Sequence, residues 1–285
     1  MKRAKKKSAA KKPTRRIKEP KPTPKIKPAA KKPRAINFVS GPSRSRRFGF
    51  SVNVNFGTPG HSCGWNCVYC PWRAPGEKIT KAPETAPLNA IEILASLRDR
   101  LAGAPEVETV ILGGSSEPTT HPEFADIVAG VLELKKELQG KWITVCLSNG
   151  EGLSQPSVRT ACNRLDETWV KLDCAEDVLF GKTNKPSPRS LKSVRALATP
   201  LKQMRRLCVQ STLWRYPDKP GFQNWSADNL SGLLALYQEL KPQVVHLVTV
   251  KRRRVFEGVQ PVSYDELEAF ALRVAELGIP VEAFA

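Results

Sequence analysis

The sequence lacks several features that define common classes of protein. It contains no run of eighteen apolar residues, which argues against a membrane-spanning helix. Its N-terminus has no apolar segment of the kind that a secretory signal needs, so we expect a cytoplasmic protein. The seven cysteines are odd in number and form no regularly paired framework. This favours a reducing compartment over a scaffold held together by disulfides.

Aromatic residues are absent from residues 1–34, and acidic residues nearly so. This segment carries sixteen basic side chains against the single Glu19, a net charge of +15, whereas the remainder has 30 basic and 26 acidic side chains, or +4. Lys, Ala and Pro dominate it and like charges repel, so we predict a disordered basic tail. Such a tail can bind the phosphates of RNA or DNA by charge, without base stacking. A solubilising extension without a partner is the alternative.

From residue 35 onwards, segments with the pattern of strands and of helices alternate. Short apolar runs predict strands at 51–56, 107–112, 142–147, 168–173, 207–213, 244–250 and, at the end, 280–284. Helical spacing predicts helices at 86–103, 122–139, 188–198, 228–240 and 263–277. Ser263 and Glu266 form a capping box for the last helix. Repeated strand–helix units imply a parallel sheet with right-handed crossovers, and 285 residues suffice for one α/β barrel.

Three of the seven cysteines, Cys63, Cys67 and Cys70, lie within eight residues directly after the first predicted strand. A closed zinc site needs a fourth protein ligand, usually from a second Cys/His pair further along the chain, and no such pair follows. Three thiolates suit a [4Fe–4S] cluster in which one iron stays open to a small ligand. Zinc with His61 as the fourth ligand is the alternative.

Small and polar residues follow the next two predicted strands, where a parallel barrel places its chemistry. Gly114 and Ser115 allow a backbone to approach a ligand closely, and the carboxylate of Glu117 can accept hydrogen bonds from an ammonium group. Ser148 and Asn149 come after the third strand, in a tripeptide that is also an ordinary turn. We therefore expect a ligand site at this edge of the sheet.

Charged residues also end the later strands. Lys171 and Asp173 share one face of the fourth strand by alternation, which favours a polar cavity over a surface ion pair. Gln210, on the fifth strand, is a weaker candidate of the same kind. Three arginines, Arg252, Arg253 and Arg254, follow the sixth strand and are suited to contact phosphates, although a solvated loop would explain them almost as well.

The cysteine spacing, with the aromatic Tyr69 just before the last cysteine, resembles the cluster loop of radical S-adenosylmethionine (SAM) enzymes. Further motifs follow in an order that resembles the Fe–S oxidoreductase group related to wyosine-base-forming tRNA enzymes. They lie at 41–49, 116–124, 170–174 and 209–211, and the likeness covers roughly residues 37–283.

This resemblance implies an α/β fold, a partial (β/α)6 TIM-type barrel of parallel strands over residues 35–285, after the tail. It implies a [4Fe–4S] cluster on the three cysteines, whose open iron binds SAM, and reductive cleavage of SAM to a 5′-deoxyadenosyl radical. It also implies a reductant such as flavodoxin or ferredoxin. By the same resemblance, residues at the strand ends bind SAM or face the substrate. They are Gly114, Ser115 and Glu117 at the methionyl group, Ser148 and Asn149 at the ribose, Tyr69 and Gln210 in the cofactor site, and Lys171 and Asp173 towards SAM or substrate.

The sequence departs from the wyosine enzymes in two ways. Residues 1–62 contain no cysteine for a second cluster, which argues against pyruvate-dependent tRNA chemistry. Cys174 stands where relatives usually have Ala, and we expect it, like Cys146 and Cys208, to lie in the core. The tail and the basic loop favour a nucleic acid such as tRNA as substrate. A small metabolite or a protein is the alternative, and a nucleic-acid-binding protein with structural zinc is the alternative outside enzymes.

Overall fold

The computed structural model describes residues 38–57, 63–72, 88–104, 106–188, 190–251 and 256–285. Internal contacts divide the chain into two units, Met1–Arg34 and Ala35–Ala285. The predicted basic tail and the loop of Arg252, Arg253 and Arg254 lie outside the described residues, as does His61. None of the described helices is long and apolar enough to cross a membrane.

One curled sheet organises the second unit. Its strands follow the order β1-β2-β3-β4-β5-β6-β7-β9, and the short β8 pairs with β6. β1 is antiparallel to β2, whereas every later neighbour along that order is parallel. The strands are β1 (Val39–Ser45), β2 (Gly49–Val54), β3 (Thr109–Leu112), β4 (Ile143–Ser148), β5 (Glu167–Lys171), β6 (Leu207–Arg215), β7 (Val244–Thr249), β8 (Gln260–Pro261) and β9 (Val281–Phe284).

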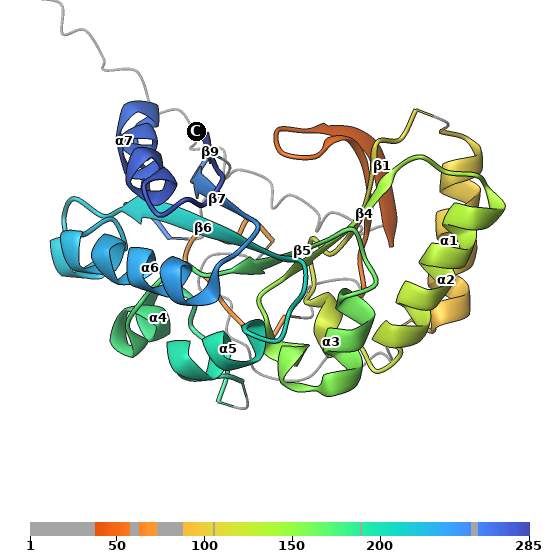
Figure 1. The fold of residues 1–285 in the computed structure, drawn as a ribbon, viewed down its shortest axis with the longest axis horizontal. Helices are drawn as coiled ribbons and strands as arrows, with labels where there is room; N and C mark the ends of the chain where they lie inside the picture. The colour runs from red at the N-terminus through yellow and green to blue at the C-terminus, as the bar shows by residue number, and fades with distance from the viewer. Residues whose placement is uncertain (1–37, 58–62, 73–87, 105, 189, 252–255) are drawn as a thin grey trace, which may run out of the picture. The chain divides into compact units, whose positions relative to one another are not determined.

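Helices connect the parallel strands and line one side of the sheet, as Figure 1 shows. They are α1 (Ala90–Ala102), α2 (Phe124–Glu137), α3 (Pro156–Cys162), α4 (Asp177–Thr183), α5 (Val194–Leu201), α6 (Ala227–Leu240) and α7 (Tyr264–Ala275). Short 3-10 turns follow two strand ends, at Pro118–Thr120 and Glu151–Ser154. Side-chain caps fix several helix starts. The predicted capping box of Ser263 and Glu266 is present at α7.

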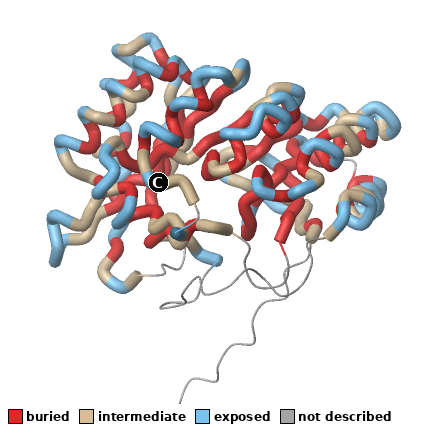
Figure 2. The backbone as a smooth tube through the Cα atoms, turned by 90° about the horizontal axis from the view of Figure 1, so that it is seen from below, coloured by how far each residue is buried: buried red, intermediate tan, exposed pale blue. Residues whose placement is uncertain are grey.

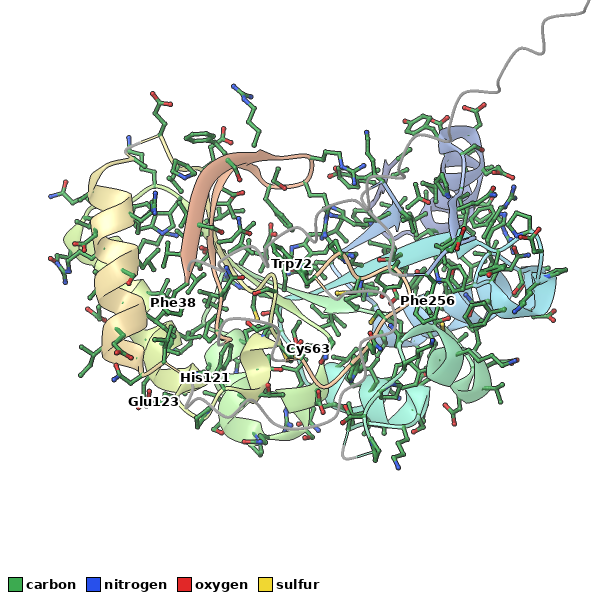
Figure 3. The ribbon with its side chains drawn as sticks, turned by 180° about the vertical axis from the view of Figure 1, so that it is seen from behind. Phe38, Cys63, Trp72, His121, Glu123 and Phe256 are labelled. Carbon is green, nitrogen blue, oxygen red and sulfur yellow. The ribbon has the colours of Figure 1, made fainter. Side chains whose placement is uncertain are left out.

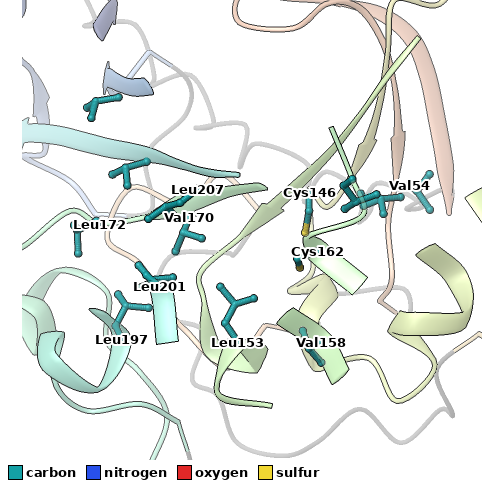
Figure 4. Packing of buried hydrophobic residues seen from close by; sticks show 14 of the residues in the cluster. Val54, Cys146, Leu153, Val158, Cys162, Val170, Leu172, Leu197, Leu201 and Leu207 are labelled. Atoms are coloured by element: carbon teal, nitrogen blue, oxygen red, sulfur yellow. The ribbon is translucent and has the colours of Figure 1, made fainter. Parts of the chain in front are cut away.

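The main core lies between the sheet and the helices. Alternate strand residues point to it, among them Val54, Cys146, Val170 and Leu207 in Figure 4, and helix residues such as Leu197 meet them. Figure 2 shows the buried backbone concentrated in the strands, with exposed segments outside them. The cysteines Cys146, Cys174 and Cys208 are buried, as predicted.

The opposite face of the sheet, which we call the inner face, is concave. The rings of Trp169 on β5 and His246 on β7 approach to 3.8 Å between centroids although β6 lies between the two strands. Phe48, in the turn between β1 and β2, packs on Trp169 with centroids 5.8 Å apart. With Ile111, Val145 and Cys208, these rings form a small second apolar cluster. The inner face is therefore closed by side chains near the beginnings of the strands.

The predicted partial barrel of parallel strands is confirmed, and β9 extends it as expected. The prediction missed β1, whose segment contains Gly41-Pro42 and a register irregularity and so lacks alternation. It also missed α3 and α4, seven residues each, which are too short to show helical periodicity. The fourth predicted strand is shorter than expected: β5 ends at Lys171, so Asp173 lies in the loop after it.

Candidate active site at the carboxyl ends of the strands

The cysteine loop begins just beyond β2 and is held in place by the segment that follows α4. The amide of Val68 donates to the carbonyl of Thr183 at 2.9 Å, and the amide of Ser187 donates to the carbonyl of Gly64 at 2.8 Å. Trp65 packs edge-on against Phe180 of α4, with ring centroids 5.0 Å apart. These contacts fix the loop at the edge of the sheet where the parallel strands end. In Figure 3, Cys63 and Trp72 lie between the two groups of helices.

Two asparagines hydrogen-bond to the cysteine sulfurs. Asn149, just after β4, donates from Nδ2 to the Sγ of Cys63 at 3.5 Å, and Asn184, just after α4, donates to the Sγ of Cys67 at the same distance. Burial is the largest cause that raises the pKa of both thiols, to about 12 for Cys67. Neighbouring Cys70 raises the pKa of both further. A bound cationic group would supply the missing positive charge and favour the thiolates.

The thiols of the cysteine loop are the candidate ligands for a metal group. Within the described residues, no three His, Cys, Asp or Glu side chains are placed around one point as a single metal ion requires. A [4Fe–4S] cluster instead distributes its cysteine ligands over separate iron atoms. Donors at two of the sulfurs are the kind of outer interaction that tunes such clusters. The cluster on Cys63, Cys67 and Cys70 stays a prediction.

Glu117 lies at the centre of a buried group of hydrogen bonds between the ends of β3 and β4. Its Oε1 accepts from the amide and hydroxyl of Thr119 and, at 2.6 Å, from the hydroxyl of Ser148. Its Oε2 accepts from the amide of Asn149 at 2.6 Å. Burial nevertheless raises the pKa of Glu117, because the hydrogen bonds only partly offset the cost of removing the charge from water. Thus three predicted site residues, Glu117, Ser148 and Asn149, are brought together.

Gly114 and Ser115 lie beside the end of β2. The side-chain oxygen of Asn55 accepts from the amide of Ser115 at 3.1 Å. Gly114 has φ +138°, and a Cβ there would lie 2.5 Å from that oxygen, so only glycine fits without a shift. Asn55 was not predicted as a site residue, and it is the group that shapes this turn.

A second buried carboxylate, Asp173, connects β5 and β6 to the cysteine loop. Its Oδ2 accepts from the hydroxyl of Tyr69 and, at 2.8 Å, from Nδ2 of Asn184. Its Oδ1 accepts from the amide of Thr212 at 2.7 Å, and Nζ of Lys171 lies 3.9 Å away. Burial and the charge of Asp173 raise the pKa of Tyr69 well above its usual value, so Tyr69 stays a neutral donor.

Lys171 and Gln210 also belong to this network. The Nζ of Lys171 donates to the hydroxyl of Thr212 at 3.0 Å and lies 4.5 Å from the centre of the Tyr69 ring. Nε2 of Gln210 donates to the same hydroxyl at 3.1 Å. Lys171 and Gln210 are partners in the register of β5 and β6, so both lie in one row on the inner face. The predicted cavity-lining pair Lys171 and Asp173 therefore shares one network with Tyr69 and Gln210.

No motif or spacing in the sequence indicates a role for Asn184 or Thr212. Asn184 lies in an irregular segment and reaches Asp173, eleven residues away, and Cys67, 117 residues away. Thr212 is an ordinary strand residue whose partners lie on a neighbouring strand. Only the folded arrangement identifies these two side chains as parts of the site.

No protein-family model matches the chain. A Helicobacter pylori protein named UPF0026 protein is 26% identical over 81% of this chain and 71% of its own length. A UPF0026 protein of Synechocystis is 31% identical over 52% of each chain.

Several solved structures have a similar arrangement of strands and helices. A radical SAM methyltransferase from Sphaerobacter thermophilus gives a TM-score of 0.59 at 17% identity, covering 82% of this chain and 66% of that one. TYW1 with a bound lysine-pyruvate adduct gives 0.55 at 18% identity, covering 79% and 73%. Streptococcus suis SuiB bound to S-adenosylmethionine gives 0.56 at 14% identity, covering 79% of this chain and about half, 48%, of SuiB. The chain thus has the fold of radical SAM enzymes, and the predicted resemblance is confirmed at that level.

Proposed function

We propose that the chain is a radical SAM enzyme in which Cys63, Cys67 and Cys70 hold a [4Fe–4S] cluster and SAM occupies its open iron. One observation carries the proposal. The three-cysteine loop lies at the carboxyl ends of the parallel strands, where Asn149 and Asn184 donate hydrogen bonds to its sulfurs. Structures of this fold with bound S-adenosylmethionine support the choice of cofactor. When bound, the cluster and SAM would supply a 5′-deoxyadenosyl radical that abstracts hydrogen from the substrate.

The chain's own residues would orient these groups. Among the described residues, three donors occupy Oε1 of Glu117 and one occupies Oε2, so Oε2 would keep an acceptor position for the ammonium group of SAM. The turn at Gly114 and Ser115 lets the backbone approach the same group. Asn149 would join the ribose site to the cluster, because its amide reaches Cys63.

Lys171 and Asp173 would line the substrate side. Asp173 is fully buried and holds Tyr69 and Asn184, so it fixes the loop around Cys67. Lys171 is part-exposed and provides a positive charge on the inner face. Their network excludes water from the place where a radical would form, which protects a reactive intermediate.

For the substrate, we propose a nucleic acid, with tRNA as the first to test. The support is the net charge of +15 on residues 1–34 and the run Arg252, Arg253 and Arg254. A small metabolite or protein substrate is the rival within the same enzyme class. The reductant, flavodoxin or ferredoxin, and the cytoplasmic location stay predictions. Removing residues 1–34 would lower RNA affinity and its dependence on salt if the nucleic-acid proposal is right, and would leave SAM cleavage intact in either case.

Electron paramagnetic resonance tests the enzyme class directly. The protein would be purified without oxygen, reconstituted with iron and sulfide, reduced, and measured with and without SAM. We expect a [4Fe–4S]⁺ signal that changes when SAM is added. Replacing Cys67 with Ala should abolish the cluster, whereas the matched control C208A removes a buried cysteine of the inner face and should keep it. A colourless protein with stoichiometric zinc would refute the proposal and support a zinc-containing binding protein.

A further inference from the structure

Arg47 is the side chain of the inner face that the proposed function leaves without a role. It lies in the turn between β1 and β2 and reaches across to β6 and β7. Its Nε donates to Nδ1 of His246 at 2.9 Å, and its Nη1 donates to Oε1 of Gln210. Phe48 and Trp169 pack against it, with the guanidinium carbon 4.5 and 4.8 Å from their ring centres. Arg47 is thus held firmly by four neighbours, all of them uncharged side chains.

The guanidinium has unused hydrogen-bonding capacity. Of its five N–H groups, one goes to His246 and one to Gln210, which leaves three. Nη2 is buried and makes no hydrogen bond to the described residues. No carboxylate among those residues lies within ion-pair distance of Arg47. The charges of Glu167 and Glu282 act on Arg47 only from beyond that distance, so its remaining N–H groups have no anion in direct contact among the described residues.

His246 does not compete for this anion. Burial and the nearby Arg47 lower the pKa of His246 to about 3, so its ring is neutral and Nδ1 accepts from Arg47. The proton of the neutral ring is then on Nε2, which faces Glu282 at 4.0 Å. Burial also lowers the pKa of Arg47 to about 9, which still leaves it charged at neutral pH.

A continuous chain of contacts links Arg47 to the cysteine loop. Gln210 accepts from Arg47 and donates to Thr212, and Thr212 also accepts from Lys171. The amide of Thr212 donates to Asp173, which accepts from Tyr69. His246 and Lys171 flank Gln210 in one row across β5, β6 and β7. Side chains of one row on the inner face thus connect Arg47 with the residues that hold the cysteine loop.

We propose that Arg47 binds a carboxylate group of the substrate on the inner face. The remaining N–H groups on Nη1 and Nη2 form the end-on fork that matches a planar carboxylate. The contacts of Nε with His246 and of Nη1 with Gln210 fix the direction in which this fork points. A phosphate carrying two charges would need a second free cation, and Lys171, the nearest on this network, is already shared by Thr212 and Asp173.

That the carboxylate belongs to the substrate rests on the proposed enzyme class, and it favours the rival small-metabolite or protein substrate over a nucleic acid, whereas the anion site itself rests on neither. The test therefore uses binding alone, with the full chain and no reductant. Thermal unfolding would be followed while sodium acetate is added at constant ionic strength set with sodium chloride, and again with sodium phosphate. A ligand that binds the folded state raises the unfolding temperature with a saturable dependence on concentration. For an anion as small as acetate, a dissociation constant on the order of 1 mM or weaker is expected.

Acetate binding by the wild type is compared with binding by two glutamine variants, one at Arg47 and one at a control position. Arg47→Gln should weaken acetate binding by about ten- to a hundredfold, which is the loss expected for a hydrogen bond to a charged group. Arg44→Gln removes the same charge from an exposed position in β1 and should bind acetate like the wild type. Comparing Arg47→Gln with Arg44→Gln also corrects for the general stabilisation that excluded salts give to any folded protein, because both variants experience it equally. Arg47→Lys keeps the charge but not the fork, so it should bind with intermediate affinity, and it serves if Arg47→Gln fails to fold.

Each outcome decides the proposal. Acetate-specific stabilisation that is lost in Arg47→Gln and kept in Arg44→Gln would support it. Equal stabilisation of wild type and Arg47→Gln would overturn it and leave Arg47 as an anchor for the β1–β2 turn. Tighter binding of phosphate than of acetate would also overturn it, in favour of a phosphate-bearing substrate. None of these binding measurements needs the iron–sulfur cluster. A negative result would therefore refute the anion site alone and leave the electron paramagnetic resonance test of the enzyme class unaffected.

Discussion

The two faces of the same sheet differ in chemistry although they alternate along the same strands. On β6, Val209 and Leu213 face the helices in the main core, and Ser211 on that side is satisfied by Tyr237 of α6. Gln210 and Thr212, between them, carry the polar network of the inner face. The apolar face holds the fold together, whereas the inner face carries Arg47 and, in contact with Tyr69 of the cysteine loop, Lys171 and Asp173.

This division explains how an apolar strand can carry chemistry. Parallel strands in α/β folds are covered on their helical side and need apolar residues there at every second position. The intervening positions are free to be polar only where other polar groups satisfy them. On the inner face they are satisfied by one another: Thr212 alone bonds to Lys171, Gln210 and Asp173.

The largest expected effect tests the helix-facing side. Leu213→Ala removes a fully buried side chain from the main core and should lower the free energy of unfolding by about 2–5 kcal/mol. Chemical denaturation measures this change. Ile91→Ala, on the exposed side of α1, is the matched control and should change it by less than about 0.5 kcal/mol. Similar values for the two variants would contradict the assignment of Leu213 to the core.

A smaller change is expected in how the free energy of unfolding depends on pH, because His246 on the inner face is buried. The folded protein holds His246 with a pKa of about 3, below its usual 6.5. Below pH 6.5 the unfolded chain binds a proton that the folded chain does not, so stability is complete above about 6.5 and falls as the pH drops towards 3. The loss should be on the order of 1 kcal/mol for each pH unit.

The variant His246→Gln isolates this contribution, because glutamine can still accept from Arg47 and does not titrate. Unfolding by denaturant would be measured from pH 7.5 to 4.5 for both proteins. The wild type should lose more stability on acidification than the variant. Parallel curves would show that His246 is solvated and that the inner face is more open than its contacts indicate.

We expect the smallest change in stability, but a large loss of activity, when Lys171 is replaced. Lys171→Met removes a part-exposed charge whose distance to Asp173 is 3.9 Å, and Asp173 keeps its donors Tyr69, Asn184 and the amide of Thr212. We expect a change of about 1 kcal/mol or less in unfolding free energy. Cleavage of SAM or turnover of substrate should fall much further, measured as the rate of 5′-deoxyadenosine release. A variant with normal turnover would place Lys171 outside the active site.

Most of the fold followed from local pattern, because the parallel strands from β2 to β7 are short segments that are either largely apolar or alternate apolar with polar residues. Patterns failed where local signals are weak: β1 is interrupted by Gly41-Pro42, and α3 and α4 have only two turns each. For the site, strand order placed Glu117, Ser148 and Asp173 at neighbouring strand ends. The sequence could not reveal Asn184, Thr212 or the role of Arg47, because each is defined by partners more than ten residues away.

The contact between Arg47 and His246 has a consequence for how the chain folds. The two residues are 199 positions apart, and the inner face is incomplete until they meet. Contacts of such long sequence separation form late, because the loop between them has to close first. A ribosome releases Arg47 long before His246. The helix-facing core can therefore assemble progressively, whereas this part of the inner face has to wait until His246 has been made.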